Sequence, residues 1–283
     1  MRSARARLRA LHVLAAVALC LGGLATPAAA DDGPTANQPP RAVPAARSYP
    51  RTFTSYDGLV EYATSVAAAQ EPLNDRLAGL TRRDDAASAA LAAVFDPEVR
   101  ARLGDADADL VDNPRSAKLR AQLAADATAR QELMASGAIA RAQGPWRLPL
   151  DGEITQPFGP TDVIYEPPLN YGGASYAHFH TGTDIGAPWG ASIYAPAAGT
   201  VVFAGTMGDG AEVVVIAHDA GLVSMYAHLD NFVLPPPVKA GDTVRAGDPI
   251  GNVGLTGITT GAHLHWSVWR NGELIDPLSL VGA

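Results

Sequence analysis

The segment GITTGAHLHWSVW, residues 257–269, places two of the chain's seven histidines one residue apart. Its β-branched and aromatic residues predict a strand. Alternate residues of a strand point to one face, so His263 and His265 would lie roughly 7 Å apart on that face. In such a pair, one imidazole can bind a metal ion and the other can lie beside the molecule that the metal binds. Two histidines on the solvent face of a hairpin would look the same in the sequence.

A second segment, HFHTGTD at residues 178–184, supplies a carboxylate at matching spacing. On an extended segment His180 and Asp184 leave the same face, and imidazole with carboxylate is a donor set that suits zinc. With His265 they would provide three protein ligands and leave one coordination position for water, as in catalytic zinc sites. His228, in YAHL at 226–229, is a further candidate because no packing role explains it.

Two other histidines are interpreted differently. His178 could be a rival ligand, but the metallo-β-lactamase pattern H-x-H-x-D-H fails because Gly182 and Thr183 follow Thr181. We therefore expect His178 in a loop or groove, and we expect His218, beside Asp219 at a strand end, to face solvent. Several aromatic side chains could line a substrate groove or pack in the core: Tyr165, Tyr171, Tyr176, Phe179 and Tyr226.

Three motifs together resemble the lysostaphin-type, or LytM-like, zinc endopeptidases that cut peptidoglycan. They are HTGTD at 180–184, YAHL at 226–229 and TGAHLHW at 260–266, in that order and after LPLDGEITQPFG at 148–159. The resemblance covers about residues 146–277 and includes the closing NGELIDP. It implies a mostly antiparallel β-sheet domain with a narrow groove over one bound zinc ion.

The resemblance also implies roles for five residues. The zinc ligands would be His180, Asp184 and His265, and the non-ligand catalytic histidines would be His228 and His263. Degenerate relatives lack ligands and act as binding or activating modules, whereas none of the five is substituted here. One of the two catalytic histidines would be the general base, and the sequence leaves open which. Residues 160–177 depart from the family pattern because no arginine follows the Phe-Gly pair, which affects the groove wall.

The chain divides into four predicted parts, with an α+β fold overall. Residues 1–30 have a basic start, a short apolar run and a small-residue end, which predicts a secretory signal peptide. Residues 31–50 are a Pro-rich linker. Residues 51–144 are helical, with Asp96-Pro97 and Asn113-Pro114 as helix starts and Gly104 and Gly137 as ends. Residues 145–283 are glycine-rich and β-rich, with strands predicted at 200–205, 211–218, 222–229 and 263–269.

Within the helical part we expect a small bundle. Its last helix should bury an apolar stripe made of Leu119, Leu123, Ala127, Leu133 and Met134, interrupted by Arg130. The same stripe could instead be an interaction face for a partner helix, but core packing is the commoner cause of such a stripe. The helical region as a whole could bind a regulatory protein.

Charge and cysteine content narrow the function classes. Without the four arginines of residues 1–30, 17 basic residues remain against 29 acidic ones, which argues against nucleic acid or an anionic membrane as partner. The one cysteine lies in the predicted signal peptide, so a metal site must use His, Asp or Glu. No later segment is apolar and long enough to cross a membrane. We therefore expect a secreted, extracytoplasmic, cell-wall-associated protein.

Three functions fit these observations. The first is a secreted zinc endopeptidase that hydrolyses peptide cross-links of bacterial peptidoglycan. The second is a non-catalytic wall-binding or hydrolase-activating protein regulated by its helical region. The third is a zinc peptidase acting on a protein, such as a glycine-rich one.

Overall fold

The computed structural model describes residue 49 and residues 52–94, 114–139 and 144–282. The predicted signal peptide, nearly all of the predicted linker and the predicted helix after Asp96 lie outside the described residues. Among the helices that are described, none has the length and apolar character needed to cross a bilayer.

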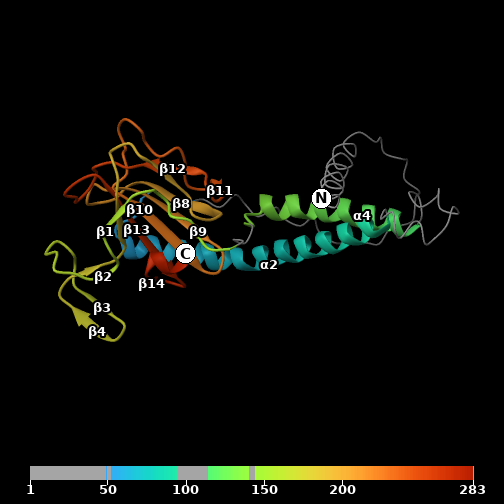
Figure 1. Ribbon diagram of the computed structural model, residues 1–283, viewed down its shortest axis with the longest axis horizontal. Helices are drawn as coiled ribbons and strands as arrows, with labels where there is room; N and C mark the ends of the chain where they lie inside the picture. Colours follow the sequence, from blue (N-terminus) through green and yellow to red (C-terminus); the bar gives the residue numbers. More distant parts are fainter. Residues whose placement is uncertain (1–48, 50–51, 95–113, 140–143, 283) are drawn as a thin grey trace, which may run out of the picture. The chain divides into compact units, whose positions relative to one another are not determined.

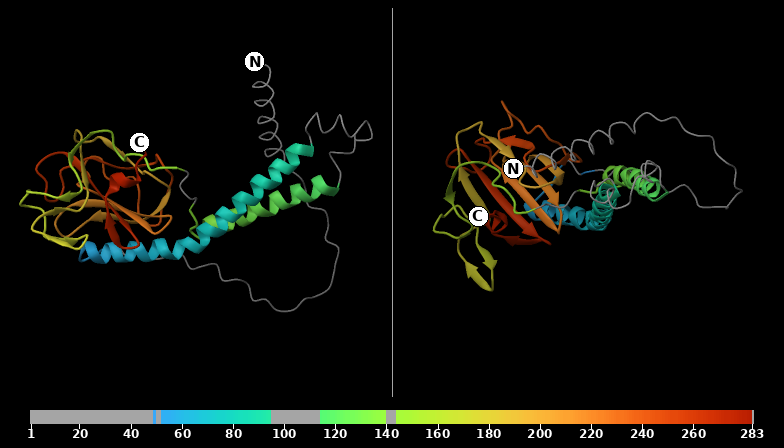
Figure 2. Two further views of the ribbon diagram at one scale, coloured as in Figure 1. Left: turned by 60° about the horizontal axis from the view of Figure 1, so that its bottom comes forward. Right: turned by 45° about the vertical axis from the view of Figure 1, so that its right-hand side comes forward.

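The helical prediction for residues 51–144 is confirmed where the structure describes them. Helix α2 spans Tyr56–Val94 and helix α4 spans Pro114–Ala135. Alanine-rich sequence favours both helices, and Gly137 at φ +91° follows α4, so that helix ends where the glycine predicts. The second half of α2 lies beside α4 (Figure 2). Two ion pairs join these helices, Arg83–Asp126 at 2.6 Å and Arg130–Asp84.

The apolar stripe predicted for α4 is only partly correct. Leu133 is buried between the helices, but Met134 is 56% exposed. The buried face instead includes Asp126, which is paired with Arg83, and Arg130 contacts α2 through Asp84. Ion pairs between the helices thus occupy part of the face for which the sequence predicts apolar packing.

Among the described residues, eight strands form one antiparallel sheet (Figure 1). The sheet order is β1-β6-β13-β10-β9-β8-β11, with β14 also paired to β13. The bounds are β1 Glu153–Gln156, β6 Thr183–Gly186, β8 Gly199–Thr206, β9 Glu212–His218, β10 Leu222–Ala227, β11 Thr243–Val244, β13 His263–Arg270 and β14 Glu273–Ile275. The four predicted strands correspond to β8, β9, β10 and β13.

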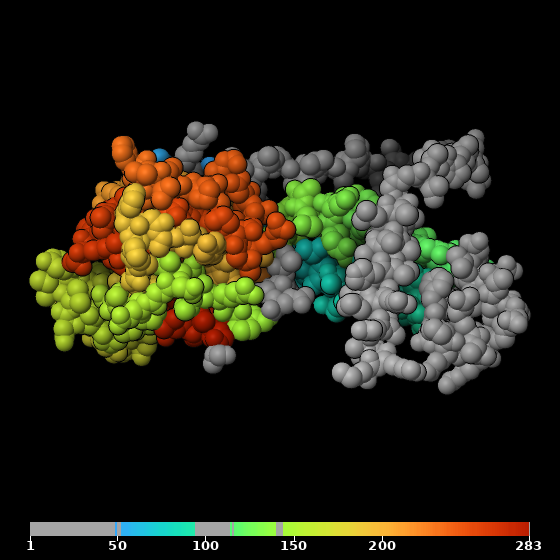
Figure 3. Space-filling model, turned by 45° about the horizontal axis from the view of Figure 1, so that its top comes forward, coloured from blue at the N-terminus to red at the C-terminus, as the bar shows by residue number. Residues whose placement is uncertain are grey.

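Smaller elements surround this sheet. Three strand pairs accompany it: β2 (Gly159–Pro160) with β5 (Phe179–His180), β3 (Leu169–Tyr171) with β4 (Ala174–Tyr176), and β7 (Ser192–Tyr194) with β12 (Pro249–Asn252). The 3-10 helix η3 spans Pro277–Leu280. The hairpin β3–β4 lies in the segment 160–177 and belongs to the yellow-green lobe at the left edge of Figure 3.

Both faces of the sheet are buried over its central strands. One face packs under the loops and short strands, through residues that include Trp146, Ile193, Val214, Ile216, Tyr226, Ile250, Leu264 and Trp266. The other face packs against the first half of α2, through Leu59, Ala63, Val66 and Ala67 of the helix and Val202, Val213, Val215, Ala217, Val223 and Met225 of the sheet. The sequence did not predict this helix-on-sheet layer.

The expectation that His218 faces solvent is wrong. His218 is 1% exposed, packs on the Trp146 ring at 4.6 Å and contacts the Ser224 hydroxyl at 2.7 Å. It shares its sheet face with Val214 and Ile216, and that face is core. Phe179 and Tyr226 are also buried, so packing explains these two aromatic side chains, whereas Tyr165 is 73% exposed.

Candidate metal centre

The predicted ligand residues come together where three strands meet. His265 on β13 pairs directly with Asp184 on β6, and residues opposite each other on antiparallel strands share a face. His180 ends β5, whose pairing with β2 brings the ring to the same point. The pairing of β13 with β6 therefore places His263, His265 and Asp184 on one face of the sheet.

Three potential ligand atoms form a nearly equilateral triangle. The His180 Nε2 atom lies 3.1 Å from His265 Nδ1 and 3.1 Å from Asp184 Oδ1, and the latter two atoms are 3.0 Å apart. Tetrahedral zinc with bonds of about 2.0 Å has ligand atoms about 3.3 Å from each other. The triangle therefore fits one face of a zinc tetrahedron.

The hydrogen bonds of the two rings set which nitrogens face the triangle. His180 Nδ1 donates to the Pro157 carbonyl at 3.0 Å, so its Nε2 carries the lone pair. His265 Nε2 lies 2.8 Å from the Ser267 hydroxyl, which can accept a hydrogen bond from Nε2–H and leave Nδ1 as the ligand atom. The lone pairs of His180 Nε2 and His265 Nδ1 and the carboxylate of Asp184 then converge on one buried point. Such a set of donor atoms binds a cation.

The charges at this cluster perturb its titration. Burial raises the pKa of Asp184, but hydrogen bonds from His180 and His265 outweigh burial and hold that pKa well below its usual range. Burial likewise lowers the pKa of His180, yet the hydrogen bond and charge of Asp184 reverse this and raise it. The carboxylate is thus ionised across the physiological range and favours positive charge at the triangle.

The two further histidines lie beside the triangle and close to each other. The rings of His228 and His263 are 4.8 Å apart, and the rings of His228 and His265 are 6.0 Å apart. His228 Nδ1 donates to the Thr256 carbonyl and His263 Nδ1 to the Gly261 carbonyl, both at 2.8 Å. The His228 ring therefore keeps an Nε2 lone pair, and His263 Nε2 lies 3.5 Å from Asp184 Oδ2.

His228 is held in an unusual environment. Its φ of +63° is left-handed, a conformation that non-glycine residues rarely adopt and that surrounding structure must enforce. Burial lowers its pKa to about 4, with the charges of His265 and His263 acting in the same direction and the Thr256 hydrogen bond opposing them. The ring is therefore neutral at neutral pH and able to accept a proton.

Glu166 reaches this site although the motifs do not contain it. Its Oε1 atom lies 4.0 Å from His180 Nε2 and accepts a hydrogen bond of 3.1 Å from Gln156. Its backbone carbonyl accepts from His178 Nδ1, which places His178 beside the site as a loop residue rather than in the triangle. No periodic pattern marks Glu166, because a loop delivers it. Ser267, at i+2 from His265, could have been found by parity.

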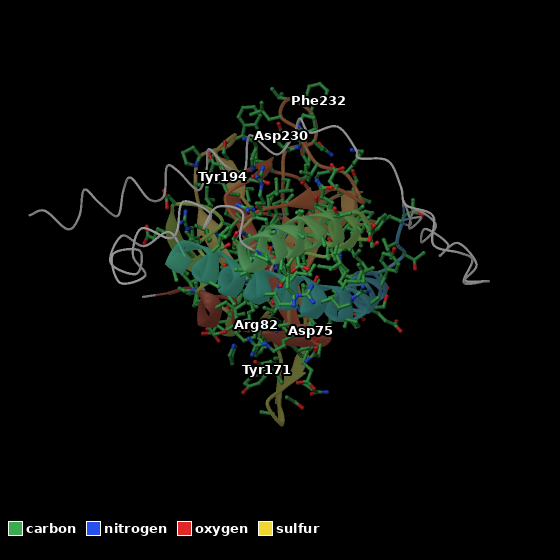
Figure 4. All side chains as sticks on the ribbon, turned by 90° about the vertical axis from the view of Figure 1, so that its right-hand side faces the viewer. Asp75, Arg82, Tyr171, Tyr194, Asp230 and Phe232 are labelled. Atoms are coloured by element: carbon green, nitrogen blue, oxygen red, sulfur yellow. The ribbon has the colours of Figure 1, made fainter. Side chains whose placement is uncertain are left out.

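The loop after His228 presents exposed apolar side chains on a fixed backbone. The Asp230 carboxylate accepts hydrogen bonds from the backbone N–H groups of Phe232, Val233 and Leu234. Phe232 is 89% exposed and lies at the tip of this loop in Figure 4, far from Tyr171 of the β3–β4 hairpin. These two segments are separate features of the molecular surface.

Comparisons with known proteins relate the β-sheet region to a peptidase family. Residues 178–277 match the model of peptidase family M23. The chain is 41% identical over 101 residues to the DD-carboxypeptidase/endopeptidase Mpg of Neisseria meningitidis serogroup B, a match that covers 36% of this chain and 22% of that protein. It is 32% identical over 134 residues to the murein hydrolase activator NlpD of Salmonella typhimurium, covering 47% of this chain and 30% of that protein.

A solved zinc-containing peptidase from Vibrio cholerae is 29% identical, with 47% of this chain and 39% of that chain covered and a TM-score of 0.40. The chain spans less than a third of the length of the curated relatives Mpg and NlpD. The family match extends from His178 to Pro277 and contains all five histidine and aspartate residues described above. Through this β-sheet region, the chain belongs to peptidase family M23.

Proposed function

We propose that this chain is an exported zinc-dependent endopeptidase that hydrolyses peptide cross-links of bacterial peptidoglycan. The observation that carries the proposal is the triangle of His180 Nε2, Asp184 Oδ1 and His265 Nδ1 at 3.0–3.1 Å spacing, with two more imidazoles beside it. Structural zinc sites have four protein ligands, whereas a catalytic site has three and keeps one position for water or substrate.

The roles follow from the hydrogen bonds of each side chain. His180, Asp184 and His265 would hold one zinc ion, which when bound lowers the pKa of a coordinated water to about 7 and polarises a carbonyl group. His228, neutral and with Nε2 free, would accept the proton of the attacking water and pass it to the leaving amine.

His263 would take the complementary role. Its Nε2 lies 3.5 Å from the Asp184 Oδ2 atom, beside the triangle. From this position the His263 ring would donate a hydrogen bond from Nε2 to the oxyanion that forms during attack. The two rings thus have different environments, and we assign His228 as the base and His263 as the oxyanion donor.

The substrate class rests on similarity to peptidoglycan enzymes. Mpg is a DD-carboxypeptidase/endopeptidase, and NlpD is a murein hydrolase activator. We extend the peptide-cutting activity to this chain because the five polar residues expected for it are all present and converge. The predicted signal peptide would deliver the protein to the cell wall.

The test is release of peptides from purified peptidoglycan, followed by mass spectrometry. The full mature chain should release cross-link fragments, a chelator should stop the release, and added zinc should restore it. His228→Ala should retain zinc and lose turnover. Release that continues unchanged in the chelated protein would contradict the proposal.

A second function is favoured by one comparison. The match to NlpD covers more of this chain than the match to Mpg, and it allows a non-catalytic activator role in which the helical region binds a regulatory protein. Stoichiometric zinc with no peptide release, together with stimulation of a separate wall hydrolase, would support that role. Faster digestion of oligoglycine than of wall sacculi would instead indicate a protein substrate.

A further inference from the structure

The first half of α2 lies on the sheet face that carries the ligand residues. His265 pairs with Ala227, so both side chains lie on one face of the sheet. Ala227 alternates with Met225 and Val223, and these three belong to the apolar layer packed against α2. The helix therefore covers β8, β9 and β10 on this face, directly beside the strands β13 and β6 that hold the cluster.

Polar contacts fix both ends of this packed half. At its start, the Tyr56 hydroxyl lies 3.1 Å and 3.0 Å from the two carboxylate oxygens of Asp209, in the turn between β8 and β9. Further along, the buried Gln70 amide donates to the Thr200 hydroxyl at 2.6 Å. Glu71 accepts from the Ala220 N–H at 3.1 Å. These contacts fix the position of the first half of α2 on the sheet.

The turn that Tyr56 contacts supports the loop that orients His228. Asp209 also accepts from the Ala211 N–H at 3.0 Å, and the adjacent Glu212 N–H donates to the Thr256 hydroxyl at 2.9 Å. The Thr256 carbonyl in turn accepts from His228 Nδ1. The two loops are in direct contact, because a Cβ on Gly257 would lie 2.6 Å from the Ala211 Cβ.

We propose that Tyr56 of α2 is a positioning residue for His228, an inference that rests on the proposed function for its catalytic consequence. By tying Asp209, Tyr56 fixes the turn against which Thr256 is held, and Thr256 selects the His228 tautomer with the proton on Nδ1. That tautomer leaves Nε2 free to accept a proton. The first half of α2, from Tyr56 to Glu71, therefore belongs to the working catalytic unit and is not a detachable regulator.

The apolar layer gives this linkage its rigidity. Leu59, one turn after Tyr56, is fully buried and belongs to the same apolar layer as Met207 and Ala211 of the supported turn. Burial, together with the hydrogen bond and charge of Asp209, raises the pKa of the Tyr56 hydroxyl above its ordinary value. The phenol therefore remains protonated and able to donate through the neutral range.

The experiment compares Tyr56→Phe with the unmodified full chain. Phenylalanine keeps the ring and removes the hydroxyl. Loss of this hydrogen bond should lower kcat for peptide release by about threefold with KM and zinc content unchanged. Long-range 1H–15N spectra of the imidazoles should show a second His228 tautomer. Asp209→Asn, which keeps an oxygen acceptor, should resemble the unmodified chain, and Tyr194→Phe on β7 is the matched control.

The tautomer measurement separates this inference from the proposed function. A Tyr56→Phe chain with an unchanged His228 spectrum would overturn the positioning role, even if its melting temperature falls. If the unmodified chain releases no peptide, the proposed function fails, and the His228 spectrum still decides whether Tyr56 positions the ring.

Discussion

Ser267 gives a quantitative test of how the cluster holds its metal. Its hydroxyl lies 2.8 Å from His265 Nε2, and the residue is fully buried. Ser267→Ala removes the acceptor and leaves a buried N–H without a partner, which costs about 1–3 kcal/mol. A factor of ten corresponds to about 1.4 kcal/mol. Zinc affinity should therefore fall roughly 5-fold to 150-fold, in line with the 10-fold to 100-fold typical of residues that support metal ligands.

The assay is competition for zinc between the protein and a chromophoric chelator. Ser65→Ala, on the exposed side of α2, should leave zinc affinity unchanged and serves as the control. Circular dichroism before and after zinc addition checks that both variants are folded. Equal zinc affinity for Ser267→Ala and the unmodified chain would refute the assignment of Nδ1 as the His265 ligand atom. Binding through Nδ1 requires a proton on Nε2, and Ser267 is the hydrogen-bond acceptor for that N–H.

Two further predictions concern stability. Leu59→Ala should lower the free energy of unfolding by about 2–5 kcal/mol, measured by urea titration followed by tryptophan fluorescence. Met134→Ala, on the exposed surface of α4, should change that free energy little. Equal effects of the two substitutions would mean that α2 does not fold with the sheet. Burial lowers the pKa of His218 from 6.5 to about 4, so the unfolded chain binds a proton between these values that the folded chain does not. Stability should fall by about 3 kcal/mol as the pH drops from 6.5 to 4, and His218→Asn should remove that share of the pH dependence; an unaltered pH slope in the variant would contradict a buried, neutral His218.

Residue parity on strands explains why much of the site could be predicted. Alternate residues of a strand share a face, so His263 and His265 lie on one face of β13. Asp184 lies on that face as well, because β6 pairs with β13 and Asp184 is opposite His265. That His180 joins them depends on the short β2–β5 pairing, which no periodicity in the sequence reveals. Glu166 was missed for the same reason, since the irregular loop after β2 carries it to the cluster.

The helix-on-sheet layer was missed although β9 contains a signal for it. The run from Val213 to Ala217 is continuously apolar, which is typical of a strand buried on both faces rather than on one. A second covering layer was therefore required, and the alanine-rich first half of α2 provides it. The same parity places His218 with Val214 and Ile216 in the core, so its burial was also encoded in the pattern.

Zinc content of a matched pair of variants tests the central claim most directly. His263 and His265 lie two residues apart on β13, yet only His265 has an atom in the triangle. Elemental analysis of the purified proteins should find one zinc per chain in the unmodified protein and in His263→Ala, and almost none in His265→Ala. Equal zinc in both variants, or no zinc in the unmodified protein after reconstitution, would contradict a metal centre built from His180, Asp184 and His265.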